Sequence, residues 1–198
     1  MGLLEQLKCL KGELFRMEQS APIKVLRECD ATLIPSGEDI KLIKGTVVRI
    51  TQSLGGDYTL YVSGNLVKLS GKDADAIGKT PLPNSQKNES YKGMEFNEEM
   101  VWEQLKTCYD PEIPVNIVDL GLVYDLRVKG TNKEGFDLHV KMTLTAPGCG
   151  MGPSIAQDVE SKIMSLPNVK DVLVEIVWEP LWHQNMMTED AKLKLGMF

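Results

Sequence analysis

The sequence is poor in the residues from which metal sites are most often built. It has only 4 cysteines and 2 histidines among 198 residues, and no two cysteines stand at the CxxC spacing of a closed zinc site. Cys9, Cys29, Cys108 and Cys149 are scattered singly instead. This spacing argues against a disulfide framework and against a four-cysteine cluster within one chain, and it favours a reducing compartment. We therefore expect a cytoplasmic protein.

Long apolar runs and clusters of positive charge are also missing. Charged residues interrupt the first eight positions, so no apolar run there reaches the length of a signal peptide or a membrane span. The formal net charge is -6, and Lys and Arg do not gather in one stretch. The sequence therefore predicts neither a membrane nor a nucleic acid as partner.

The composition that remains is that of an ordinary globular protein with a buried core, at 42% hydrophobic and 25% charged residues. Leucines at helical spacing predict an amphipathic helix within residues 1–20. Short β-type runs separated by turn residues predict a small β-rich, barrel-like domain over residues 21–78. The polar, proline-bearing residues 79–94 are typical of a linker, and residues 95–198 form a second domain.

The β-rich region is expected to contain five short strands, with a hairpin turn at Leu54–Asp57 because glycines accept the backbone angles of tight turns. It contains no recognisable catalytic constellation. Asp73 and Asp75 alternate as a pair of metal ligands would, but a turn at the start of a helix is the more common use of that pattern.

The second domain shows clear periodicity. Asn97 is a candidate cap for its first helix, and the following spacing places Cys108 in the core, as Cys29 is in the β-rich region. Helical spacing and strict alternation predict in order a helix, two strands, a helix and a strand, over residues 97–108, 122–128, 136–144, 155–163 and 172–178. The predicted fold class is α+β, with both helices on the apolar side of a mixed three-stranded sheet.

The residues around Cys149 are the most informative stretch for function. Three glycines surround this cysteine between a predicted strand and a predicted helix. A thiol near a helix N-terminus is favoured as the thiolate, the form that binds metals and attacks electrophiles. Two interpretations stay open at this point: an exposed, activated thiolate, and a tight connection in which Cys149 is only a small residue.

Acidic residues precede the first strand of this domain at Asp110, Glu112 and Asp119. If the first two strands form an antiparallel hairpin, Asp119 approaches Thr145 and Cys149 at one end of the sheet. The simpler interpretation of each carboxylate, taken singly, is a role in a turn or a cap.

Residues 110–124 and 143–151 together resemble the iron–sulfur cluster assembly domain family, once catalogued as a domain of unknown function. Residues 33–37, 51–56 and 71–76 resemble the SufT branch of that family, in which a β-rich extension precedes the domain. The resemblance implies a maturation factor that works with the assembly machinery and helps to deliver clusters to client apoproteins. It does not imply an enzyme with turnover of its own.

The resemblance also implies site residues. It identifies Cys149 as the candidate transient ligand of iron or of a cluster, with Asp110, Glu112 and Asp119 beside it. Thr145, which the hairpin geometry brings to the same end of the sheet, is a further candidate ligand. One thiolate cannot saturate a cluster that takes about four such ligands. The other ligands are expected from a second subunit of a homo-oligomer, a client protein, a small thiol or local carboxylates.

Two other classes of function are consistent with the residues alone. One is a metal-free scaffold that recruits the assembly machinery and clients, with Cys149 as a structural residue. The other is a thiol enzyme with His139 or His183 as the base, although nothing in the sequence orients either side chain for that role.

Overall fold

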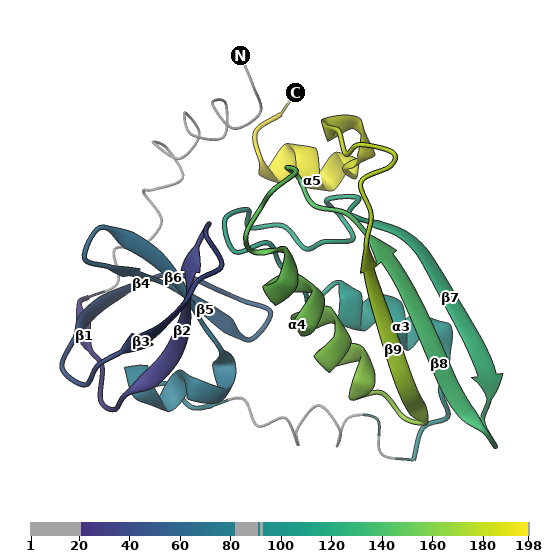
Figure 1. Cartoon of the computed structure of the whole chain (residues 1–198), viewed down its shortest axis with the longest axis horizontal. Coiled ribbons are helices and arrows are strands. Elements are labelled where there is room, and N and C mark those ends of the chain that lie inside the picture. Colours follow the sequence, from purple (N-terminus) through teal and green to yellow (C-terminus); the bar gives the residue numbers. More distant parts are fainter. Residues whose placement is uncertain (1–20, 82–90, 92, 198) are drawn as a thin grey trace.

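The computed structural model describes residues 21–81, 91 and 93–197. The helix expected within residues 1–20 and most of the expected linker lie outside this range. The described chain forms a β-rich half (residues 21–81) and a C-terminal half (residues 93–197), each built around its own sheet (Figure 1). Among the described helices, none has the length and apolar character needed to cross a membrane.

The β-rich half is one six-stranded sheet in which every pair of neighbours is antiparallel. Its strands are β1 (Ile23–Lys24), β2 (Cys29–Ile34), β3 (Asp39–Leu42), β4 (Val47–Leu54), β5 (Asp57–Val62) and β6 (Asn65–Leu69). The hydrogen-bonded order of these strands is β1-β4-β5-β6-β2-β3. β1 and β3 stand at the two ends of that order, so the sheet is open. The expectation of a barrel-like domain is met only in part, because the sheet does not close into a barrel.

This half differs from the prediction in detail. The prediction of five strands missed β1, which has only two residues and therefore no alternation to detect. The predicted hairpin turn is present, with φ of +63° at Gly55 and +94° at Gly56. Asp73 and Asp75 lie in the 3-10 helix η1 (Gly71–Ile77). Their carboxylates form ion pairs with Arg27, in which the Oδ1 atoms lie 2.8 Å and 2.6 Å from Arg27 Nη2.

The C-terminal half contains the predicted order of helices and strands, which confirms the α+β class. Its elements are α3 (Glu98–Leu105), β7 (Val123–Thr131), β8 (Gly135–Met142), α4 (Gly152–Met164), β9 (Val169–Ile176), η2 (Gln184–Met186) and α5 (Glu189–Lys194). β8 pairs antiparallel with β7 and parallel with β9, so the three-stranded sheet is mixed as predicted.

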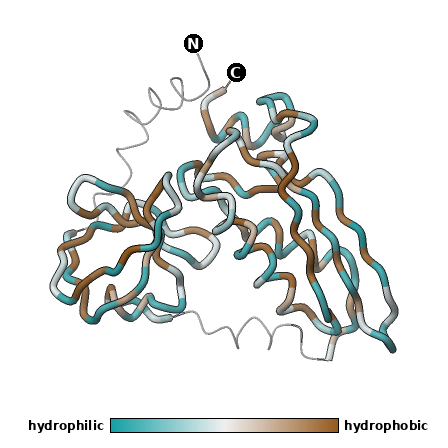
Figure 2. The backbone as a smooth tube through the Cα atoms, viewed as in Figure 1, coloured by the Kyte–Doolittle hydropathy of each residue, from teal (hydrophilic) through white to brown (hydrophobic). Residues whose placement is uncertain are grey.

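One apolar core joins α3 and α4 to the sheet. Leu105 of α3 and Val159 of α4 are fully buried in the same cluster as Val140 of β8. Apolar and polar residues alternate along the strands, as the colours of Figure 2 show, because successive side chains point to opposite faces. The face turned away from this core is polar, and there His139 Nε2 lies 3.0 Å from Glu175 Oε2.

Side chains cap two of the helices where the sequence indicates. Asn97 Oδ1 accepts a hydrogen bond from the Met100 N–H at 3.0 Å, and Thr188 Oγ1 accepts one from the Ala191 N–H at 3.2 Å. These bonds satisfy backbone donors that have no partner within the first turn of a helix. Cys29 and Cys108 are both buried, which confirms the prediction that they belong to the cores.

Candidate functional site

The Cys149 loop, residues 143–151, connects the end of β8 to the start of α4. Its backbone turns tightly: the Cys149 N–H donates to the Ala146 carbonyl at 3.4 Å, and the Gly152 N–H donates to the Cys149 carbonyl at 3.2 Å. Gly148, which lies between Ala146 and Cys149, has φ of +79°, a conformation that favours glycine. Pro153 follows in the first turn of α4, where its missing N–H leaves no bond unmade.

The groups around Cys149 shift the pKa of its thiol in opposite directions. The side chain is partly buried, and this burial raises the pKa of the thiol. The backbone N–H groups of Met151 and Gly152 favour the thiolate, as the helix N-terminus predicts, but the nearby carboxylates of Asp110 and Glu112 oppose them. The net shift of the pKa is upward, opposite to the direction that the helix N-terminus alone favours.

Asp110 and Glu112 come from the loop that follows α3. Asp110 is only 6% exposed, and its Oδ1 accepts hydrogen bonds from the N–H groups of Glu112 at 2.8 Å and Ile113 at 3.1 Å. Asp110 therefore stabilises a turn, as the simpler interpretation of this carboxylate predicts. The structure also brings Asp110 and Glu112 near enough to Cys149 to act on its ionisation.

Asp119 is held in a second turn. Asn116 Oδ1 accepts from the N–H groups of Val118 and Asp119, and Asn116 Nδ2 donates to Asp119 Oδ2 at 2.7 Å. The Asp119 carbonyl accepts from the Thr188 N–H at 2.9 Å, which ties this turn to the start of α5. The predicted approach of Asp119 to Cys149 stays a prediction.

Thr145 borders an open hollow of about 450 Å³ at this end of the sheet. The other lining residues belong to the segment before α5: Trp182, His183, Gln184 and Asn185. Trp182 Nε1 donates to the Leu120 carbonyl at 2.8 Å, so the hollow lies beside the Asp119 turn. Thr145 and this turn are thus neighbours of the same indole.

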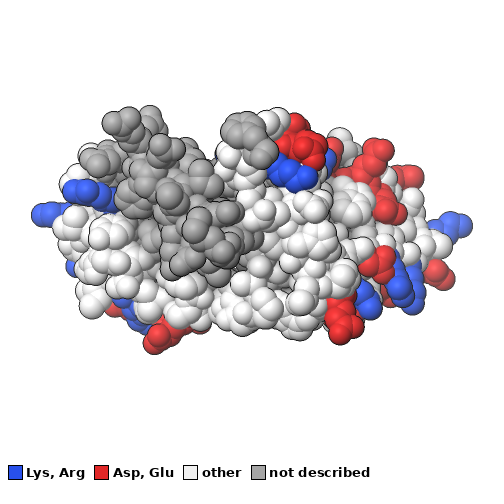
Figure 3. Space-filling view, turned by 90° about the horizontal axis from the view of Figure 1, so that it is seen from above, with Lys and Arg blue, Asp and Glu red and all other residues white. Residues whose placement is uncertain are grey.

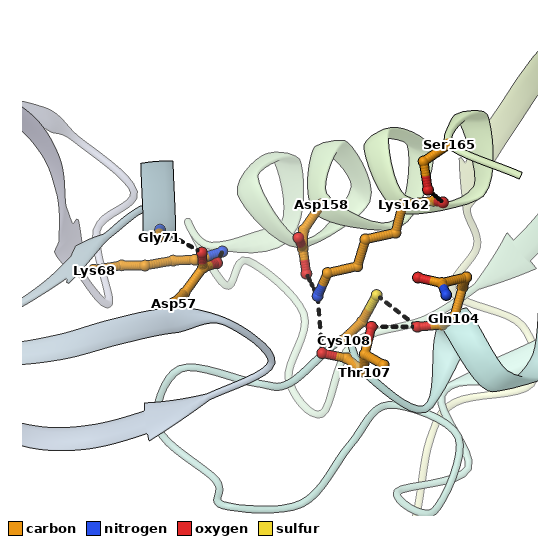
Figure 4. A network of polar contacts seen from close by, with 9 residues as sticks. All are labelled: Asp57, Lys68, Gly71, Gln104, Thr107, Cys108, Asp158, Lys162 and Ser165. Carbon is orange, nitrogen blue, oxygen red and sulfur yellow. Dashed lines mark hydrogen bonds and ion pairs between the residues drawn. The ribbon is translucent and has the colours of Figure 1, made fainter. Parts of the chain in front are cut away.

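Sequence reasoning missed a buried ion pair within α4, on the side of the helix that faces the β-rich half (Figure 4). Lys162 of α4 is 5% exposed, and its Nζ donates to Asp158 Oδ2 at 2.7 Å and to the Thr107 carbonyl at 2.8 Å. Burial lowers the pKa of Lys162, but nearby carboxylates, Asp158 foremost, raise it, and the net shift is upward. The signal that could have found the pair is the i,i+4 spacing of opposite charges on a predicted helix.

The Lys162 pair borders a small cavity between the halves. Its volume is about 20 Å³, room for roughly one water molecule, and Asp57 and Lys68 line it from the β-rich side. Lys68 Nζ lies 3.2 Å from Asp57 Oδ2. Burial raises the pKa of the adjacent Cys108 thiol to about 12, so this sulfur stays protonated.

The two histidines lie in different places of the C-terminal half. His139 lies on the polar face of the sheet next to Glu175, while His183 lines the hollow. Within the described part of the chain, no three His, Cys, Asp or Glu side chains come together as a group that could hold a metal ion.

Comparison with known proteins matches one family model to most residues of the candidate site. Residues 98–176 match the family model described as "Iron-sulfur cluster assembly protein". The matched region contains the loop with Asp110 and Glu112 (the acidic loop), the Asp119 turn, and the Cys149 loop with Thr145. The β-rich half lies outside it.

Two curated relatives have similar names. A "Fe-S protein maturation auxiliary factor" from Porphyromonas gingivalis is 46% identical over 99 residues, which are 50% of this chain and 90% of the relative. The "Fe-S protein maturation auxiliary factor YitW" from Bacillus subtilis is 43% identical over 93 residues, which are 47% of this chain and 87% of the relative.

A solved structure is similar in the same way. The crystal structure of a domain of unknown function (DUF59) from Bacillus anthracis is 33% identical, with a TM-score of 0.44. The match covers 56% of this chain and 98% of that one. The sequence identity to relatives matched over nearly their full length decides the assignment, and this chain belongs to the iron–sulfur cluster assembly protein family.

Proposed function

We propose that this protein assists the assembly of iron–sulfur clusters or their transfer to client proteins, with Cys149 as a transient ligand of iron or of the cluster. The observation that carries the proposal is the family match over residues 98–176, because these residues hold Cys149 and the acidic residues around it. The relatives' name, Fe-S protein maturation auxiliary factor, supports the same role.

The burial of the described cysteines supports Cys149 as the ligand. Cys29 and Cys108 lie in the two apolar cores, whereas Cys149 is partly exposed in its loop. A thiolate is the usual protein ligand of iron in clusters. Cys149 is therefore the described cysteine that cargo iron reaches without opening a core.

The raised pKa of Cys149 suits a ligand that must release its cargo. Iron binds the deprotonated sulfur, so iron and the proton compete for Cys149. Burial and the charges of Asp110 and Glu112 favour the proton in the free protein. The competition weakens the hold on iron and makes its transfer to another protein easier.

Cys149 provides one of the about four ligands that a cluster takes. Glu112, Asp119 and Thr145 are the local oxygen ligands that we propose near it. The remaining thiolates come from a second copy of the chain in a homo-oligomer, from a client apoprotein or from a small thiol. The protein works with the assembly machinery in the cytoplasm, without turnover of its own.

A metal-free scaffold is the second candidate function. The observation that favours it is the β-rich half, which lies outside the family match and is large enough to recruit other proteins. In that case Cys149 is a structural residue of the loop.

Anaerobic reconstitution with ferrous iron and sulfide separates the two functions. We expect visible absorption and bound iron in the wild-type chain, their loss in Cys149→Ser and their retention in Cys29→Ala. If Cys149→Ser holds as much iron as the wild type and supports client maturation equally well, the ligand role is wrong and the scaffold remains.

A further inference from the structure

The β-rich half inserts an apolar side chain into the core of the C-terminal half. Ile34, the last residue of β2, is 7% exposed and belongs to the same buried cluster as Leu144 and Met151, on either side of Cys149. Leu66, opposite Ile34 on β6, packs against that cluster as well, and so does Cys149. The two halves therefore share apolar contacts next to the candidate site.

The turn after Ile34 lies directly against the Cys149 loop. A Cβ atom on Gly150 would collide with the Ser36 carbonyl, and a Cβ atom on Gly37 would collide with the Gly150 carbonyl. Contact this close is possible only because both positions are glycine. The backbone of Pro35–Gly37 thus occupies one side of the Cys149–Gly150 segment, and Figure 1 shows the turn between β2 and β3 beside that loop.

The β-rich half also contacts the chain just before the acidic loop. A Cβ atom on Gly55 would collide with the Thr107 carbonyl, and Thr59 Oγ1 lies 3.5 Å from the Pro111 carbonyl. Asp110 lies between these two contact points along the chain. Figure 4 shows Asp57 and Lys68 of the same half facing the Lys162 pair. One rigid sheet therefore touches both loops that supply the candidate site.

We propose that the β-rich half is a built-in cover for one side of the Cys149 loop, held there by Ile34 and by the contact of Gly37 with Gly150. A protein that exchanges iron with Cys149 must approach from a side that the Pro35–Gly37 turn does not occupy. This inference goes beyond the proposed function, because it concerns access to the thiol and holds whether or not Cys149 binds iron.

The test compares two alkylating reagents of different size on the full chain. Mass spectrometry of the Cys149 peptide gives the rates for iodoacetamide and for a polyethylene-glycol maleimide, and their ratio measures how far the thiol is covered. We expect Gly37→Ala to raise the bulky-to-small ratio severalfold, because the new methyl group pushes the turn off Gly150.

Gly45→Ala is the matched control. Gly45 lies in the turn between β3 and β4 with φ of +92°, comparable to +76° at Gly37, but a Cβ atom there would meet nothing within 4 Å. Both substitutions strain the backbone, and only Gly37→Ala disturbs the cover. An unchanged ratio in folded Gly37→Ala, or an equal rise in both variants, overturns the proposal.

A second measurement leaves the glycines in place. Ser36 is exposed, so Ser36→Cys keeps the fold. We expect a short bismaleimide crosslinker, which alkylates two thiols, to join this position to Cys149 within one chain. It is not expected to join Lys44→Cys to Cys149, because Lys44 is exposed at the opposite end of β2 and β3. Failure of the Ser36→Cys crosslink also overturns the cover, even if Gly37→Ala does not fold. Neither assay contains iron, so their failure is distinct from failure of the proposed function.

Discussion

Two groups of carboxylates, one in each half of the molecule, have different partners. In the β-rich half, Asp73 and Asp75 pair with Arg27, which fixes a 3-10 helix to the sheet. In the C-terminal half, Asp110 accepts backbone N–H groups in a loop beside a partly buried thiol, and its charge acts on that thiol. On the face seen in Figure 3, positive and negative side chains of the C-terminal half lie next to one another. The difference teaches that a carboxylate near a cation fixes local structure, whereas a carboxylate near a thiol changes the pKa of that thiol.

The largest expected effect tests whether the halves fold together. Leu60 of the β-rich half and Leu105 of the C-terminal half are both 0% exposed, and replacing either with Ala costs about 2–5 kcal/mol of unfolding free energy. The three tryptophans, Trp102, Trp178 and Trp182, all lie in the C-terminal half, so their fluorescence reports that half alone. We expect Leu60→Ala to lower the fluorescence transition as well as the far-UV circular dichroism transition, because Ile34 couples the cores.

The control for this comparison is Leu193→Ala. Leu193 is 57% exposed, so its replacement changes the unfolding free energy by less than about 0.5 kcal/mol. A Leu60→Ala variant whose fluorescence transition stays unchanged would show that the halves unfold independently.

The next effect concerns the buried Lys162–Asp158 ion pair of α4. Lys162→Met leaves Asp158 without its cation in a mostly buried position, which costs about 3 kcal/mol in urea denaturation. The double variant Lys162→Met, Asp158→Leu recovers most of that loss, since no charge is then left unpaired. Lys192→Met, whose partner Glu189 is exposed, changes the stability by less than about 1 kcal/mol. Equal losses for Lys162→Met and Lys192→Met would contradict the burial argument.

A smaller effect is expected from the helix caps. Asn97→Ala removes the acceptor for the Met100 N–H and costs about 1 kcal/mol, and Asn97→Gly costs only a few tenths. Thermal unfolding followed by circular dichroism measures both variants. Similar losses for Ala and Gly would mean that packing, and not the cap, explains the effect.

The smallest expected effect concerns the pH at which the alkylation rate of Cys149 rises. Burial and the carboxylates of Asp110 and Glu112 hold the pKa of this thiol above its ordinary value. The alkylation rate follows the thiolate, so it rises at higher pH than for a free cysteine. Glu112→Gln removes one negative charge and shifts the profile toward lower pH. A wild-type profile below that of free cysteine would mean that the N-terminus of α4 dominates instead.

Local sequence signals predicted most of the C-terminal fold. The alternation of residues 136–144 predicted β8, and Asn97 marked the start of α3 because a cap acts within one turn. The helical spacing that predicted a buried Cys108 is also confirmed by the structure. These features depend on neighbours a few residues apart in the chain.

Contacts between distant residues were not predictable in the same way. Arg27 meets Asp75 across 48 positions, and Ile34 joins a core built by the other half. The sequence shows the helix N-terminus that follows Cys149, but it does not show the burial of the thiol or the position of Asp110, which both raise its pKa. The side chains that surround a site come together only in the folded chain, so local sequence patterns do not identify them.

The most direct test of the central claim is client maturation in cells that lack this chain. Activity of an iron–sulfur client enzyme is measured after complementation with the wild type, Cys149→Ser and Cys29→Ala, each at equal protein level. The account predicts that the wild type and Cys29→Ala restore the activity and that Cys149→Ser does not. Full restoration by Cys149→Ser would contradict the claim that this sulfur handles the cluster.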